Sequence, residues 1–480
     1  MLFNSLHFLV FLVLVLSAYY GLPHRLRWLL LLLASLYFYM VWNPVYILLL
    51  LAATSVDYLG AYRMSMLPDP AARRPWLILS MSLNLGILFT FKYFNFISRS
   101  VTGLAQQFDP GFEGVVHELI LPMGISFYTF QAMSYAIDVY RGELKAERHA
   151  GMYFLFITFF PQLVAGPIER AGNLLGQLRK HVQFDYARFT SGIRQAAWGM
   201  FKKVVIADRL APMVNEVYNA PEEYTGVSLA LATFLFAYQI YCDFSGYSDI
   251  ALGTARMLGI DLMDNFNRPY YAKSITEFWR RWHISLSTWF RDYVYIPLGG
   301  NRVVKWRWYY NLFITFLVSG IWHGANWTFV IWGALHGLYI VAEQAVRLPA
   351  FRGRLWDALR VGWVFVLVGI SWVFFRANTV SDAWLILGRM IGGIPESLAL
   401  LRSDPVKHLY LGQDSGYFLI SVFAVACLEA VQLMQRRQGV RYFFEDRPAW
   451  FRWSFYAALL LMMIFFGMYH DKSEFIYFQF

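Results

Sequence analysis

The chain has 480 residues, of which 58% are hydrophobic, 19% are aromatic and only 15% are charged. Soluble globular proteins carry roughly a quarter of charged residues, so this composition excludes an ordinary water-soluble protein. The 41 lysine and arginine residues outnumber the 31 aspartate and glutamate residues. Most of this excess lies in short loops between apolar runs, where basic residues orient membrane helices, so we expect no nucleic-acid partner.

Apolar runs recur along the chain and are separated by charged residues, proline or glycine. The clearest runs cover residues 2–20, 28–42, 45–60, 76–97, 119–139 and 229–258. Because a crossing helix needs roughly 20 apolar residues, the chain length predicts about 11 transmembrane helices. The first run lacks a basic start and a cleavage site, so we expect a first helix and not a signal peptide. We predict an all-α, polytopic membrane protein with a single membrane domain over residues 1–480.

The loops between these runs alternate in charge. Basic residues recur at 25–27, 63–74, 141–148, 347–360 and 436–452, whereas the loop at 109–118 is acidic. Since basic loops of membrane proteins face the cytoplasm, we expect both termini to lie outside the cytoplasm.

Proline and glycine interrupt two apolar stretches, residues 121–124 and 160–167, which predicts broken or re-entrant helices there. Residues 277–293 separate bulky apolar and polar side chains onto two faces at helical spacing. We predict one amphipathic helix that lies along the membrane or dips into it. Its polar face would carry Glu277, Arg280, His283, Ser287 and Arg291.

His323 is the sharpest functional candidate, because it lies about 14 residues, or roughly 21 Å, along a helix that starts near Tyr309. A polar residue at this depth costs several kcal/mol unless it is paired or faces water. A neutral imidazole there could remove a proton from a hydroxyl group. The alternative is a core histidine that is hydrogen-bonded to a backbone carbonyl.

Other polar residues in apolar surroundings have weaker functional interpretations. His283 could work with His323 or be a solvated residue of the amphipathic helix. A metal site that adds His336 is unsupported, because no two of these histidines have ligand spacing along a helix. Asp243 and Asp249 are expected to pair with Arg268, Arg280, Arg281 or Arg291.

Three motifs together resemble the membrane-bound O-acyltransferase family, in particular its bacterial branch of alginate O-acetyltransferases and D-alanyl transfer proteins. They are YCDFSGYSDIALGTARMLGI from residue 241, NFNRPYYAKSITEFWRRWHISLSTWFRDYVYIPLGGNR from residue 265 and LVSGIWHGANWTFVIWGALHG from residue 317. FFPQLVAGPIER at 159–170 and the terminal FIYFQF at 475–480 match the same branch.

The resemblance implies an acyltransferase of the inner membrane whose helices surround a central tunnel. Its donor would be a cytoplasmic thioester, acetyl-CoA or an acyl carrier, with no tightly bound cofactor and no metal. The acetyl group would modify an exported polysaccharide such as alginate, often through a periplasmic partner protein. His323 takes the position of the family's catalytic base, and His283 would orient or polarise the acceptor or the thioester carbonyl.

The remaining candidate residues would bind substrate in this scheme. Tyr241, Tyr247 and Asn326 could stabilise a developing oxyanion, and Asp243 and Trp322 lie in the same motifs. Arg280, Arg281, Arg291 and Lys273 would meet the phosphates of coenzyme A or an acidic carrier protein, or else face lipid.

A transporter or channel for an exported polymer or lipid-linked glycan is the main alternative from another class, since buried polar residues and broken helices also serve transport. Such proteins often repeat an interrupted helix in their two halves, and the two halves of this sequence show no such pair.

Overall fold

The computed structural model describes residues 1–117, 119–164, 166–346, 353–435, 443–444, 447–469 and 475–476. Every regular element in these ranges is helical, which confirms the predicted all-α class. Most of the FIYFQF motif, and parts of the basic loops at 347–360 and 436–452, lie outside the described residues.

The chain divides into two compact units. Unit 1 comprises residues 1–193 and 251–263, and unit 2 comprises residues 194–250 and 264–480. The helices α10 (Tyr186–Phe201) and α12 (Val227–Met257) contribute residues to both units.

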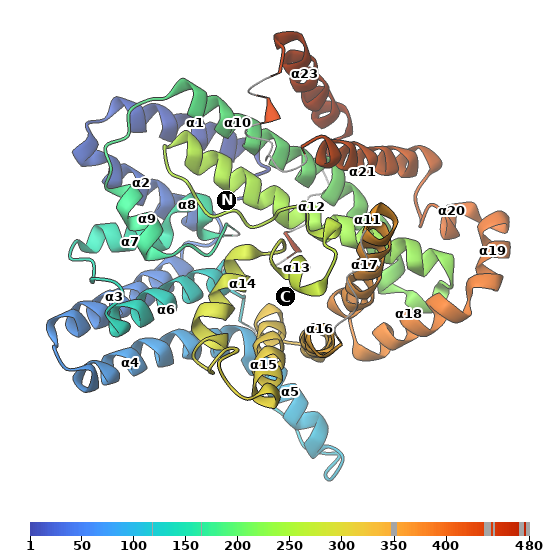
Figure 1. Ribbon diagram of the computed structural model, residues 1–480, viewed down its shortest axis with the longest axis horizontal. Coiled ribbons are helices and arrows are strands. Elements are labelled where there is room, and N and C mark those ends of the chain that lie inside the picture. The colour runs from blue at the N-terminus through green and yellow to red at the C-terminus, as the bar shows by residue number, and fades with distance from the viewer. Residues whose placement is uncertain are drawn as a thin grey trace. The chain divides into compact units, whose positions relative to one another are not determined.

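Unit 1 is built from the N-terminal helices, of which α3, α4 and α6 lie side by side (Figure 1). Asp69 caps α4, and the helix starts at Pro70, where the missing N–H of proline costs nothing. A π-helix joins α4 to α5, so apolar sequence continues as helix from Pro70 to Ala105. The elements are α1 (Leu6–Gly21), α2 (His24–Met40), α3 (Tyr46–Met66), α4 (Pro70–Leu88), η1 (Phe89–Tyr93), α5 (Phe94–Ala105), α6 (Ile125–Arg141), α7 (Ala150–Thr158), α8 (Phe160–Leu163) and α9 (Ala171–Leu178).

The two stretches that proline and glycine interrupt are both broken, as predicted. α7 ends at Thr158, and the four-residue α8 follows after one non-helical residue, Phe159. Gly124 starts α6 in the left-handed region with φ 73°, and a Cβ atom there would lie 2.6 Å from the carbonyl oxygen of Leu163. Only glycine fits at position 124, because any side chain there would clash with the backbone at Leu163.

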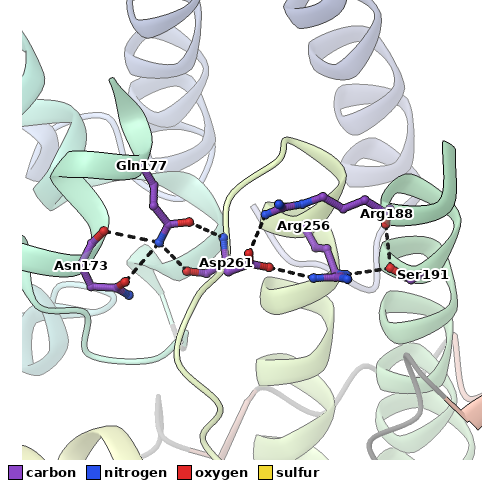
Figure 2. Close-up of polar contacts among 6 residues, drawn as sticks. All are labelled: Asn173, Gln177, Arg188, Ser191, Arg256 and Asp261. Atoms are coloured by element: carbon purple, nitrogen blue, oxygen red, sulfur yellow. Dashed lines mark hydrogen bonds and ion pairs between the residues drawn. The ribbon is translucent and has the colours of Figure 1, made fainter. Parts of the chain in front are cut away.

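A polar network at Asp261 connects α9, α10 and the last turn of α12 (Figure 2). Its carboxylate accepts hydrogen bonds of 2.8 Å each from Arg188 and Arg256. Gln177 bonds to the backbone N–H and carbonyl of Asp261, and Arg256 also donates to Ser191. Because the Asp261 side chain is 50% exposed, each ion pair adds little stability, about 0–1 kcal/mol.

Unit 2 contains a large aromatic and aliphatic core in which Trp282, Trp332 and Trp372 are completely buried. The antiparallel neighbours α15 and α16 pack closely, and α17 packs against α16 (Figure 1). The elements are η2 (Lys202–Ala207), α11 (Asp208–Asn219), η3 (Pro221–Glu223), η4 (Pro269–Tyr271), α13 (Ile275–Trp279), α14 (Ile284–Phe290), η5 (Arg291–Tyr295), α15 (Lys305–His323), α16 (Trp327–Ala345), α17 (Arg354–Arg376), α18 (Val380–Gly392), α19 (Ile394–Ser403), α20 (Pro405–His408), α21 (Ser415–Gln435) and α23 (Ala449–Phe466).

Within the described ranges, six helices are long and apolar enough to cross a membrane, or seven if the bent pair α18 and α19 is one span. α1 is apolar but shorter, with 16 residues. The total of about 11 spans therefore stays a prediction.

Candidate functional site

The predicted amphipathic helix at 277–293 is wrong as one continuous helix. α13 ends at Trp279, α14 begins at Ile284, and a π-helix follows from Arg291. The break falls at His283, whose backbone is left-handed with φ 43° and ψ 55°. The predicted polar face therefore does not exist as a single surface.

Asn265 holds the turn that presents His283. Its carbonyl oxygen accepts the N–H of Ile284 at 3.0 Å, and its side-chain oxygen accepts the hydroxyl of Ser285 at 2.6 Å. Its amide group donates to Ser248 on α12 at 3.2 Å. Asn265 is only 1% exposed, so these bonds are shielded from water and fix the turn to α12.

His323 is the last residue of α15, and the next residues explain why the helix stops there. Gly324 is extended, and a Cβ atom there would lie 2.2 Å from the ring of Phe329. Asn326 then caps α16 by accepting the N–H of Thr328 at 3.1 Å. The sharp turn between two packed helices thus places an imidazole at a helix end.

The structure brings His283 and His323 together in unit 2. Their ring centroids lie 6.4 Å apart, and both residues are buried, with exposed fractions of 0% and 2%. Trp322 contacts both rings, with centroid distances of 6.1 Å to His283 and 5.0 Å to His323. Trp332 packs edge-on against His323 at 4.8 Å.

Burial lowers the pKa of His283 to about 3, and this residue lies outside the candidate membrane spans. Its imidazole is therefore neutral at physiological pH and can offer one N–H donor and one lone pair.

A cavity of about 480 Å³ in unit 2 approaches this pair. Ser319, one helical turn before His323, and Ile284, the neighbour of His283, both line it. Arg280 and Arg291 also line the cavity, and both side chains are exposed. Its volume is within the range of about 300–1,000 Å³ that is usual for pockets that bind small molecules.

The other predicted binding residues lie elsewhere. Arg281 and Lys273 do not line the cavity and pair with Glu277 and Asp357, so only two of the four predicted basic residues share this site. Arg291 also pairs with a carboxylate, that of its neighbour Asp292 at 2.8 Å. Tyr241 packs among rings next to the His283 turn, 6.3 Å from Trp282 between centroids. The Asn326 amide donates to the carbonyl of Asn378 and so takes part in a structural contact.

The expected pairing of Asp243 and Asp249 with arginines is wrong. Asp243 pairs with Lys203 at 2.7 Å, and Asp249 pairs with Lys202 at 2.6 Å. Both lysines belong to the π-helix η2, whose wider turn places two consecutive side chains towards α12. Asp243 also accepts the N–H of Ile476 at 2.7 Å, and Tyr247 packs on Phe475.

His336 takes part in a hydrogen-bonded chain. Trp279 donates to its Nδ1 at 3.2 Å, and its Nε2 bonds to the hydroxyl of Ser371 at 2.9 Å. Because Ser371 donates to the carbonyl of Val368, His336 must donate through Nε2. No group of three or more possible metal ligands occurs among the described residues.

Sequence reasoning missed Asn265, Lys202 and Lys203. The two adjacent lysines lie in an apolar stretch, and charged residues in such a position indicate buried ion pairs. Nothing in the local pattern shows that Asn265 supports a residue 18 positions later.

Comparisons with known proteins agree with this architecture. Residues 149–373 match the model of the membrane-bound O-acyltransferase family. The chain is 44% identical to a probable alginate O-acetylase of Azotobacter vinelandii, over 88% of this chain and 85% of the relative. It is 33% identical to a peptidoglycan O-acetyltransferase of Helicobacter pylori, over 94% and 91%.

A teichoic acid D-alanyltransferase of Bacillus subtilis is 32% identical over 46% of this chain and 58% of the relative. These similarities confirm the resemblance that the sequence motifs indicated. With its long apolar helices, the chain is a multi-pass membrane protein. It belongs to the membrane-bound O-acyltransferase family, and it is an O-acyltransferase.

Proposed function

We propose that the protein transfers an acetyl group from a cytoplasmic thioester to hydroxyl groups of an exported polysaccharide, with alginate as the first polymer to test. The relatives that are named for alginate support this choice, because they are more similar to the chain than those named for peptidoglycan or teichoic acid. The observation that carries the chemistry is the pair of buried imidazoles 6.4 Å apart beside the cavity in unit 2.

In this proposal His323 is the general base. A ring nitrogen of His323 removes the proton of the acceptor hydroxyl while the hydroxyl oxygen attacks the thioester carbonyl. The carbon–sulfur bond then breaks, the acetyl group stays on the acceptor oxygen, and the proton passes to the departing thiolate. The neutral His283 donates its N–H to the carbonyl oxygen, which carries negative charge in the transition state.

The cavity would hold the donor. Arg280 and Arg291 would contact the phosphates of acetyl-CoA or of a carrier's phosphopantetheine arm, because charge-assisted bonds to phosphate are strong. The thioester would then extend past Ser319 towards His323. The reaction as written needs no tightly bound cofactor or metal.

We place the protein in the inner membrane, with both termini outside the cytoplasm and a tunnel that leads towards the acceptor. The alternating charge of the N-terminal loops supports this orientation. A periplasmic acetyltransferase would receive the acetyl group and pass it to the polymer.

Membrane vesicles from cells in which a variant replaces the wild-type copy provide the test. With labelled acetyl-CoA and unacetylated alginate, we expect His323→Ala to lower label transfer by several powers of ten, because the base is removed. His7→Ala, which changes a histidine in unit 1, should keep full transfer. Transfer by correctly inserted His323→Ala at the wild-type rate would refute the assignment, and absence of label in wild-type vesicles would favour a transporter.

A further inference from the structure

A second cavity, of about 150 Å³, lies in unit 1 beside the start of α2 and the end of α9. We call it the basic pocket. Four of its lining residues carry a positive charge at neutral pH. The lining comprises Tyr19, His24, Arg25, Arg27, Trp28, Leu31, Met152, Leu178, Arg179, Lys180 and Ile260.

Two of the four cations have internal partners. Arg27 donates to the carbonyls of Leu22 and Val182, at 3.1 and 2.6 Å, and Arg179 pairs with Glu147. Arg25 and Lys180 are exposed, and their side chains take part in none of the hydrogen bonds or ion pairs found among the described residues. The pocket therefore keeps two cations that a ligand can bind.

The helix α2 adds to this positive field. Its N-cap is Pro23, which provides no side-chain acceptor, and of the first three N–H groups of this 17-residue helix only that of Leu26 bonds to an acceptor among the described residues, the carbonyl of Pro23 at 3.0 Å. Unsatisfied N–H groups and the helix dipole favour an anion at this end.

The size and lining of the pocket restrict the anion. At about 150 Å³ it is smaller than the roughly 300–1,000 Å³ of pockets for nucleotide-sized or drug-sized ligands, so it suits one small anionic group. Leu31, Met152 and Leu178 make its floor apolar. Tyr19 and Trp28 are of the type that concentrates at membrane–water interfaces.

We propose that the basic pocket binds a phosphate group, supplied by the headgroup of an anionic phospholipid or by free inorganic phosphate. Basic pockets between membrane helices bind lipid phosphates in this way, with the phosphate at the cations and the glycerol towards the apolar floor. This site is separate from the acyl-transfer chemistry and does not depend on it.

The test uses the purified full-length protein in neutral detergent. Native mass spectrometry measures the binding of dioleoyl-phosphatidylglycerol and dioleoyl-phosphatidylcholine, and thermal unfolding measures stabilisation by inorganic phosphate. The variant is Arg25→Gln/Lys180→Gln. The control Arg74→Gln/Lys145→Gln removes two other exposed cations of the same unit. Arg25→Lys/Lys180→Arg keeps both charges.

We expect wild type, control and charge-preserving variant to bind phosphatidylglycerol at least about tenfold more tightly than phosphatidylcholine, and the neutral variant to lose this preference. This result would show that the phosphate group in the basic pocket belongs to a phospholipid. If inorganic phosphate alone gives stabilisation that the neutral variant loses, free phosphate is the ligand. Equal behaviour of the neutral variant and wild type, or no binding of either ligand to wild type, would overturn the proposal.

Discussion

At the scale of single residues, the candidate chemistry depends on a histidine in an unusual backbone conformation. A left-handed residue other than glycine costs of order 1–3 kcal/mol, and it persists only where its surroundings enforce it. Here Asn265 enforces it through its hydrogen bonds to Ile284 and Ser285. The left-handed backbone of His283 thus lowers the stability of the fold, and it places the imidazole next to His323.

Burial of His283 as a neutral ring makes stability depend on pH. Its folded-state pKa of about 3 is below the unfolded value near 6.5. Between about pH 6.5 and pH 3 only the unfolded chain binds this proton, so stability falls as pH falls through this range, by about 1.4 kcal/mol per pH unit. From pH 7 to pH 5 the melting temperature of His283→Gln should therefore fall less than that of wild type. Equal falls would mean that the ring is not buried in the neutral form.

The arginines of the cavity make a separate prediction. Arg280→Gln/Arg291→Gln should raise KM for acetyl-CoA by at least about tenfold, because two charge-assisted contacts to phosphate are lost. The value of kcat should change much less, since neither side chain lies at the imidazole pair. Arg302→Gln/Arg307→Gln removes the same charge from neighbouring exposed positions outside the cavity lining and should leave KM unchanged. A KM effect of equal size in both double variants would indicate nonspecific electrostatics.

At the scale of elements, the contact between α15 and α16 sets the position of His323. A Cβ atom on Gly320 would lie 2.5 Å from the carbonyl oxygen of Phe329, and one on Gly333 would lie 2.6 Å from that of Phe316. These separations are too short for any side chain, so the two helices approach as closely as they do only because both residues are glycine.

Gly320→Ala and Gly333→Ala should each destabilise the protein by about 1–3 kcal/mol, since backbone atoms must move. The shift of α15 should also lower acetyl transfer by at least about tenfold, because small displacements of a reacting group are costly. Gly369→Ala on α17, where a Cβ atom meets nothing within 4 Å, is the matched control and should keep activity. Full activity of Gly320→Ala at wild-type stability would show that this contact does not position the site.

The sequence predicted these elements well where a long apolar run ends at a proline, a glycine or a charge. The run at 229–258 corresponds to α12 within two residues, and the run at 45–60 starts within one residue of α3, which continues six residues further. The run at 277–293 failed because helical periodicity does not register a single left-handed residue, which tertiary contacts with Asn265 stabilise. The sequence predicted His323 as a candidate because an imidazole lies deep in apolar sequence. It did not predict the partner of Asp243, because that ion pair depends on the wider turn of a π-helix.

At the scale of the whole molecule, residues far apart in sequence build one site in unit 2. α12 supplies Phe244, whose ring lies 4.6 Å from His283, and α17 supplies Phe375, whose ring lies 5.6 Å from His323. The histidines come from two further segments, 40 positions apart. Aromatic packing around both rings excludes water, and for His283 this burial favours the neutral form.

The central claim is that His323 and His283 act on one reacting group. Label transfer from acetyl-CoA should be measured in vesicles for His323→Gln, His283→Gln and the double variant, each compared with wild type. If the residues act as a unit, each single variant loses at least about tenfold, and the double variant is hardly worse than His323→Gln. Losses that multiply in the double variant, or a His323→Gln enzyme within a factor of ten of wild type, would contradict the account.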